Sequence, residues 1–246
     1  RERTQQTTPT RERGTTMCGR YAASADEAAL QEVFQPDEVL QPPPRSWNLA
    51  PTDAVPAVVT QTSRDTGQRR RVLVAPRWGL VPSWAKGLGR PQVNARAETV
   101  ASKPMFRAAF ASRRCLLPAD GYYEWQPVPG GQRTKQPYFI KPDTGLLVMA
   151  GIYEHWKNPT TGTWLTSVAI ITTEATDRLG KLHDRMPVTV EPTDWEAWLD
   201  PGLTDPQAVL GLLALTGERL AGYPVSAAVG NVRNDGPELV QPLEPA

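Results

Sequence analysis

The chain has 246 residues, of which 39% are hydrophobic, so it is long enough for one sizeable domain with a buried core. A formal net charge of +1 excludes a general attraction to nucleic acid, and any such surface must be local. Two cysteines, Cys18 and Cys115, cannot form a disulfide framework, and with only two histidines, His155 and His183, we expect no metal site and no cofactor. The longest apolar run, 146–152, is too short to cross a bilayer, so we expect a cytoplasmic protein without a membrane partner.

The first stretch that points to chemistry is Met17-Cys18-Gly19-Arg20. Residues 1–16 hold no aliphatic or aromatic side chain larger than Thr or Pro, so we expect them to be disordered. We interpret Met17 as the true initiator and residues 1–16 as a mis-called extension; the alternative is that the chain cleaves itself after Met17. Either event would leave Cys18 with a free α-amino group beside its thiol.

An N-terminal cysteine is a trap for aldehydes. An α-amino group has a pKa of about 7.7–8.0, so part of it is neutral at pH 7 and can form an imine with an aldehyde. The neighbouring thiol then adds to the imine carbon and closes a thiazolidine ring, a step favoured because it is intramolecular. The alternative interpretation of Cys18 is a small buried residue after an ordinary start.

The first elements are a helix and a hairpin. Residues 24–27 have the form of a capping box and predict a helix that ends at Pro36. Segments 55–60 and 71–74 predict two strands joined by a polar loop, 63–70, whose arginines are either solvated or in contact with DNA.

Two segments rich in tryptophan predict ordered loops. One contains Asn48 between Trp47 and Pro51, and a plain turn is the alternative there. The other is the segment 76–84, where Trp78 and Trp84 either stack on unpaired bases or cover the core.

Two pairs of residues share a two-residue spacing, Asn94 with Arg96 and His183 with Arg185. Alternate side chains of an extended segment share one face, so each pair presents one hydrogen-bonding group beside a guanidinium that can bind phosphate. An imidazole also titrates near neutrality, which suits acid or base catalysis, although a structural role for His183 remains open.

The region after Arg96 predicts one helix over residues 99–110, then strand, turn and strand over 114–125. Glu124 lies near the end of the second strand, flanked by aromatic residues that would partly bury it. Further strands are expected at 137–141, 146–156 and 164–172, a short helical segment at 176–181, and helices at 192–199 and 205–215. Strands joined by short turns outnumber helices, which predicts a single β-rich α+β domain with a mostly antiparallel sheet.

Together these segments resemble the SOS response-associated peptidase family, the abasic-site processing proteins. The resemblance runs from Cys18 to about Gln241 and rests on the segments MCGRY, WNLAP, WGLVPSWAK, NARAET, CLLPADGYYEW and LHDRMPV. It implies a catalytic domain over 17–241, a tail at 242–246, and a barrel-like sheet flanked by helices. It also implies a covalent crosslink to the ring-opened abasic site of single-stranded DNA, with self-processing peptidase and weak lyase activity.

The resemblance also implies roles for individual residues. Cys18 would be the nucleophile, Asn94 would orient its amine, Glu124 would shuttle protons, and His183 would protonate the sugar oxygen. The DNA-binding residues would be Arg20, Asn48, Trp84, Arg96 and Arg185. A monomer would suffice, associated with the nucleoid when it is bound to DNA.

Two other functions remain open. Class II glutamine amidotransferases also begin with Met-Cys-Gly, but the Arg-Trp-Ala-Thr-His-Gly type of segment that they need is absent from this sequence. A non-catalytic binder of single-stranded DNA would bind reversibly, with strong salt dependence and no preference for abasic DNA.

Overall fold

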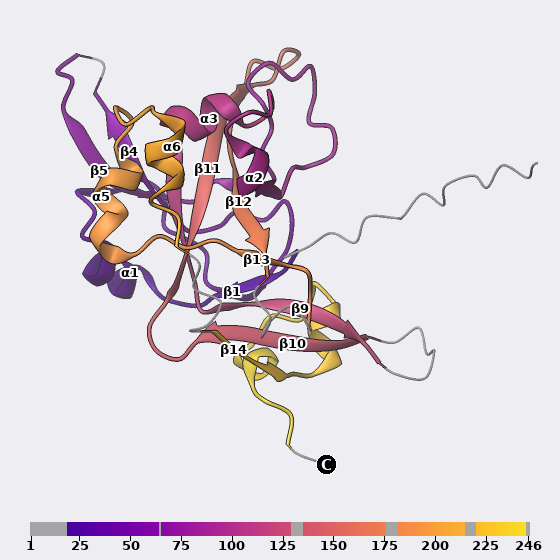
Figure 1. Ribbon diagram of the computed structural model, residues 1–246. Coiled ribbons are helices and arrows are strands. Elements are labelled where there is room, and N and C mark those ends of the chain that lie inside the picture. The colour runs from indigo at the N-terminus through magenta and orange to yellow at the C-terminus, as the bar shows by residue number, and fades with distance from the viewer. Residues whose placement is uncertain (1–18, 64, 129–134, 176–181, 215–219, 245–246) are drawn as a thin grey trace, which may run out of the picture.

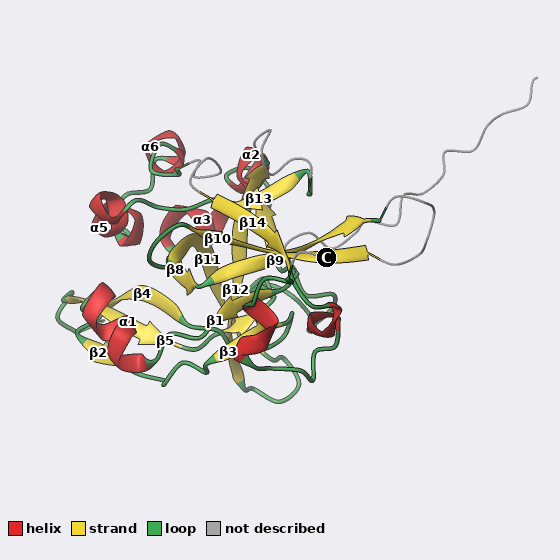
Figure 2. Ribbon diagram, turned by 90° about the horizontal axis from the view of Figure 1, so that it is seen from below, coloured by secondary structure: helices red, strands yellow, loops and turns green. Residues whose placement is uncertain are grey.

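The computed structural model describes residues 19–63, 65–128, 135–175, 182–214 and 220–244. These residues form two sheets, drawn in Figure 1 with the smaller sheet below the end of the larger one. The helices lie on the far side of the larger sheet, and the C-terminal segment lies against the smaller one (Figures 1 and 2).

The larger sheet has the order β13-β12-β11-β8-β4-β5-β2, and β6 and β7 also pair with β12. Its neighbours are mostly antiparallel, whereas β2, β6 and β7 join as short parallel strands. The strands are β2 Glu38–Val39, β4 Ala57–Thr62, β5 Arg69–Val74, β6 Arg77–Trp78, β7 Asn94–Arg96, β8 Arg114–Ala119, β11 Leu147–Lys157, β12 Trp164–Glu174 and β13 Arg185–Pro187.

The smaller sheet has the order β14-β10-β9-β1-β3 and is antiparallel throughout. Its strands are β1 Tyr21–Ala23, β3 Ser46–Leu49, β9 Gly121–Pro127, β10 Lys135–Pro142 and β14 Leu220–Pro224. One hydrophobic core lies between the two sheets, because it joins Tyr21, Tyr122 and Ile140 of the smaller sheet with Cys115 and Ile170 of the larger.

A second core packs the helices on the outer face of the larger sheet, around the buried side chains of Phe34, Phe110 and Trp198. The helices are α1 Glu27–Phe34, α2 Ala97–Val100, α3 Arg107–Ser112, α5 Trp195–Leu199 and α6 Pro206–Leu210, with 3-10 turns at Pro192–Asp194, Ala227–Gly230 and Pro237–Val240. None of the helices among the described residues has the length and apolar character needed to cross a membrane.

The prediction of a strand-rich, mostly antiparallel domain is confirmed, but neither sheet closes into a barrel among the described strands. The reason lies at Asp120, where the chain leaves β8 of the larger sheet and enters β9 of the smaller one. These two strands were expected to follow one another, and they do, but they belong to different sheets. Gly121 makes this passage possible, since a Cβ there would collide with the backbone carbonyl oxygen of Ile140 and lie 2.7 Å from the ring of Phe139.

Several helix predictions need correction. The cap of α1 is Asp26, whose side chain accepts from the backbone N–H of Ala29, and not Ser24. The single helix expected over 99–110 is two short helices, α2 and α3, because Pro104 cannot continue a helix. The helix expected over 205–215 ends at Leu210. The segment 176–181 lies outside the described residues.

Candidate active site

Asn94, Arg96, His183 and Arg185 gather around the carboxyl end of β12, whereas the loop of Trp84 contacts Trp156 near the amino end of that strand. The strand β7 pairs with Ile170–Thr172 of β12, and β13 pairs with Thr172–Glu174. The N–H of Ile170 donates to the carbonyl of Val93, whereas the carbonyl of Ile171 accepts from Val188. Consecutive residues of a strand direct these groups to opposite edges, so β7 and β13 flank β12 on opposite sides.

The spacing argument for Asn94 and Arg96 is confirmed in the backbone. Both lie in the extended strand β7, with Ala95 fully buried between them, and Arg96 is exposed. An exposed guanidinium therefore stands on the same side of the strand as the partly buried amide of Asn94.

Glu124 of the smaller sheet meets His183, which lies two residues before β13 of the larger sheet. Glu124 lies in β9 with 4% of its surface exposed, on the same face as the buried Tyr122. Its Oε2 atom is 3.9 Å from Nε2 of His183, whose side chain is 15% exposed. This distance exceeds that of a hydrogen bond, but it places a carboxylate and an imidazole in one sheltered space.

The other ring nitrogen of His183 has two neighbours. The backbone N–H of Arg185 donates to Nδ1 at 3.1 Å, and Oδ1 of Asp184 lies 2.8 Å from the same atom. A neutral ring that accepts from Arg185 carries its proton on Nε2, which faces Glu124, whereas a protonated ring can donate to Asp184.

The N-terminal strand runs beside Glu124. Tyr21 of β1 is paired with Tyr122 of β9, and the carbonyl of Arg20 accepts from the N–H of Tyr123. Continuing this antiparallel register by one residue brings Gly19 level with Glu124. The predicted nucleophile, Cys18, is the residue before Gly19 and lies outside the described residues.

Arg20 is held in place by its surroundings. Its Nη1 atom donates to Oδ1 of Asn48 at 2.8 Å and to the carbonyl of Val229 at 2.9 Å, and its guanidinium lies 5.9 Å from the centre of the Trp125 ring. Burial lowers the pKa of Arg20 from its usual range, and the carboxylate of Asp53 partly opposes this effect.

Asn48 is placed differently from the surface position that we expected. It is 3% exposed, and its Nδ2 atom lies 3.2 Å, 3.1 Å and 2.7 Å from the carbonyls of Val229, Asn231 and Asn234. Its side chain therefore ties the C-terminal loop to β3 and orients Arg20, rather than forming an open surface.

The guanidinium of Arg185 is also held by hydrogen bonds within the protein. Its Nη1 and Nη2 atoms donate to the two carboxylate oxygens of Glu98 at 2.6 Å and 2.9 Å, and Nη2 donates to the carbonyl of Thr172 at 2.7 Å. Only 6% of its side chain is exposed. Sequence reasoning missed Glu98, although its place in NARAET, four residues after Asn94, was a signal.

Of the two tryptophans, one covers the core and the other is exposed and available for stacking on a base. Trp78 is buried in the core, whereas 65% of Trp84 is exposed. The loop that carries Trp84 is held by the indole of Trp156, which donates to the carbonyl of Ala85 at 2.7 Å. Arg69 and Arg70 were expected in the loop before the strand, but they are the first residues of β5. There they form ion pairs with Asp200 and Glu38, respectively.

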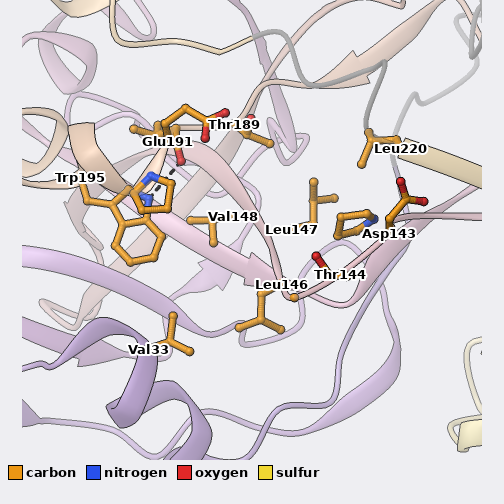
Figure 3. Close-up of a pocket in the computed structure, with 14 residues that line it drawn as sticks. Val33, Asp143, Thr144, Leu146, Leu147, Val148, Thr189, Glu191, Trp195 and Leu220 are labelled. Carbon is orange, nitrogen blue, oxygen red and sulfur yellow. Dashed lines mark hydrogen bonds between the residues drawn. The ribbon is translucent and has the colours of Figure 1, made fainter.

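A cavity of about 590 Å³ lies elsewhere, between the turn that joins β10 to β11 and the segment 189–195 (Figure 3). Its lining is mainly apolar, with Val33, Leu146 and Trp195 around it and the carboxylates of Asp143 and Glu191 at its edge. None of the predicted site residues lines it. Among the described residues, no group of three His, Cys, Asp or Glu side chains is arranged to hold a metal ion.

Comparison with known proteins gives a consistent result. Residues 17–232 match the family model described as SOS response associated peptidase (SRAP). The chain is 36% identical over 231 residues to the abasic site processing protein YoqW of Bacillus subtilis, covering 92% of this chain and 99% of that one. It is 33% identical over 267 residues to the abasic site processing protein HMCES of Gallus gallus, covering 93% and 78%.

Solved structures show the same fold. A protein from Bacteroides thetaiotaomicron superposes with a TM-score of 0.73 and 25% identity, covering 92% of this chain and all of that one. A phage-related protein from Bordetella bronchiseptica gives a TM-score of 0.66 and 28% identity, covering 85% and 94%.

Proposed function

Because the chain belongs to the SOS response associated peptidase family, we propose that it processes abasic sites in single-stranded DNA by forming a covalent crosslink through Cys18. The observation that carries this proposal is the pairing of β1 with β9, which sets Arg20 opposite Tyr123, next to Glu124, while His183 faces the carboxylate of Glu124 at 3.9 Å.

The proposed reaction has two covalent steps. The neutral α-amino group of Cys18 attacks the aldehyde carbon of the ring-opened deoxyribose, and loss of one water molecule gives an imine. The thiol then adds to the imine carbon, its proton passes to the nitrogen, and a thiazolidine ring closes. No oxidant or reductant is needed, since the only other product is water.

The neighbouring residues take the proton transfers. Glu124, nearly buried, accepts a proton from the terminal ammonium and returns it as water leaves. His183, protonated on both ring nitrogens, gives the Nε2 proton to the sugar oxygen as the ring opens and is left neutral. Asn94, in β7, orients the amine by hydrogen bonding.

Exposed side chains bind the single-stranded DNA. Arg96 is exposed beside Asn94 and suits a phosphate, and Trp84 offers a face for a base. Arg20 contributes positive charge at the start of the chain. Asn48 acts through Arg20, and Arg185 contacts phosphate only if it exchanges this contact for part of its pairing with Glu98.

The chemistry requires that Cys18 be N-terminal. In a chain that is longer at this end, the peptide bond after Met17 must be hydrolysed first, with one water consumed. We propose that the Cys18 thiol performs this cleavage as a self-processing step, with Glu124 as the base.

The test uses protein expressed from Met17 and an oligonucleotide with a single abasic site, analysed on denaturing gels. The wild-type protein is expected to give a stable adduct, and Cys18→Ser is expected to lose it but to retain weak strand nicking, because the amine can still form an imine. Cys115→Ala is the matched control, since that cysteine is fully buried in the core and burial raises the pKa of its thiol.

Two results would overturn the proposal. A stable adduct with Cys18→Ser would show that the thiol is not needed. Binding that is reversible, salt-sensitive and equal for intact and abasic DNA would instead identify a non-catalytic binder.

A further inference from the structure

The carboxylate of Glu98 makes a contact that spans the candidate site. It receives two hydrogen bonds from Arg185, at 2.6 Å and 2.9 Å, and a third from the hydroxyl of Thr173 at 3.3 Å. The hydrogen bonds from Arg185 lower the pKa of Glu98 to about 2, so this carboxylate stays ionised throughout the range in which proteins are normally assayed.

This pair connects the two edges of β12. Glu98 lies in α2, directly after β7, and Arg185 begins β13 on the opposite edge. The guanidinium of Arg185 crosses the strand to reach the carbonyl of Thr172, which points to the β7 edge, as that of Ile170 does. Figures 1 and 2 both draw α2 beside β13.

Each end of this contact is close in sequence to a predicted catalytic group. Asn94 lies four residues before Glu98, and His183 lies two residues before Arg185. The backbone N–H of Arg185 also donates to Nδ1 of His183. The strands β7 and β13 each pair with β12 over only three residues, so this contact adds a side-chain link between two short strands.

We propose that Glu98 is a positioning residue that fixes Arg185, and through it sets the orientation of His183 relative to Asn94. The proposal rests on the proposed function for its kinetic test, but the orientation of His183 can be measured without DNA. Glu98 does not touch the substrate, and its charge keeps the Arg185 guanidinium from binding phosphate indiscriminately.

The variant Glu98→Gln removes the charge and keeps the size of the side chain. Glu174→Gln is the matched control, because Glu174 is an exposed carboxylate at the end of β12 and its residue pairs with Arg185 in the sheet. Single-turnover adduct formation is measured with abasic single-stranded DNA from pH 5 to 9, and affinity is measured with undamaged DNA of the same length.

We expect Glu98→Gln to slow adduct formation without weakening the binding of undamaged DNA. Adduct formation by Glu98→Gln should slow about tenfold or more, since small displacements of reacting groups cost up to about 10²-fold. Its affinity for undamaged DNA should stay equal or increase, because a released guanidinium is then available to phosphate. A variant that had merely lost folded protein would lose both in proportion.

The position of the His183 ring supplies a test that does not depend on activity. The charged groups that face this ring are Glu124 from β9 and the adjacent Asp184. We expect Glu98→Gln to move the NMR chemical shifts of the His183 ring at constant pH, because the position of the ring between these carboxylates is no longer fixed. Glu174→Gln should leave these chemical shifts unchanged.

Arg185→Lys provides a second variant if Glu98→Gln does not fold, since it keeps the charge but cannot form the bidentate contact. It should also move the NMR chemical shifts of the His183 ring. The proposal is overturned if both the adduct rate and the His183 ring chemical shifts of Glu98→Gln equal those of the wild type. Absence of any adduct in the wild-type protein would refute the proposed function and leave the His183 measurement to decide the role of Glu98.

Discussion

Asn48 offers a direct test of the structure, because a surface role and a clamping role predict different outcomes for Asn48→Ala. The amide has two N–H groups for three nearby carbonyls, at 2.7 Å, 3.1 Å and 3.2 Å, so it can donate at most two good hydrogen bonds. Its oxygen accepts a third from the charged Arg20.

The magnitude follows from these contacts. Two neutral hydrogen bonds contribute about 1 kcal/mol each and one from a charged donor about 1.5 kcal/mol, so Asn48→Ala should lower the free energy of unfolding by about 3.5 kcal/mol. For a domain of this size each kcal/mol lowers the melting temperature by about 2–4 °C, and the expected loss is about 7–14 °C. Thermal unfolding followed by tryptophan fluorescence measures it.

The variant Asn48→Asp sharpens the comparison. It keeps an oxygen for Arg20 but turns a carboxylate toward the carbonyls of Val229, Asn231 and Asn234, so it should be at least as unstable as Asn48→Ala. A melting temperature of Asn48→Ala within about 2 °C of the wild type, together with weaker DNA binding, would refute the clamp and restore the surface role.

Three further outcomes follow from the structure. Gly121→Ala should destabilise the protein by about 1–3 kcal/mol, because its Cβ would collide with the backbone carbonyl oxygen of Ile140; an unchanged urea midpoint would contradict this close approach between β9 and β10. Trp84→Ala should weaken binding of single-stranded DNA by about 1–3 kcal/mol in fluorescence anisotropy, with an unaltered melting temperature since 65% of the side chain is exposed. Glu98→Gln should be less stable than the wild type by about 1–2 kcal/mol at pH 7. This figure is smaller than the pKa shift alone would give, because solvent screens the partly exposed carboxylate of Glu98. Because folding lowers the pKa of Glu98 to about 2, this contribution is complete above about pH 4.5 and is lost as the pH falls toward 2, so urea unfolding of the two proteins should converge there.

The pairs Asn94 with Arg96 and His183 with Arg185 could be placed from sequence because alternate residues of a strand share a face, whatever strand lies beside them. The contact between Glu98 and Arg185 could not be predicted in this way. It depends on β7 and β13 joining opposite edges of the same strand, and that is a property of the register rather than of local spacing.

Buried polar side chains were the other source of error. Asn48 was expected in an ordered loop at the surface, but it is covered by a segment almost 200 residues later in the chain. Arg114 opens a strand and was not singled out, yet it is 3% exposed and donates to the carbonyls of Phe110, Ala111, Trp198 and Leu203. Both positions are satisfied by backbone carbonyls of distant segments, which a local pattern does not reveal.

The two neighbours of Nδ1 in His183 bear on how one residue could serve both steps of the proposed reaction. The protonated ring carries a hydrogen on each nitrogen, so Nδ1 can donate to Asp184, which lies 2.8 Å away, while Nε2 gives its proton to the sugar oxygen as the ring opens. The neutral ring that remains can recover a proton at Nε2 without rotating, because Nδ1 stays beside Asp184 and the N–H of Arg185. Because both partners approach the same nitrogen, the opposite nitrogen faces Glu124 in either state. The imidazole can therefore change its charge while the reacting edge stays in place, which is a requirement for a group that must first donate a proton and later recover it.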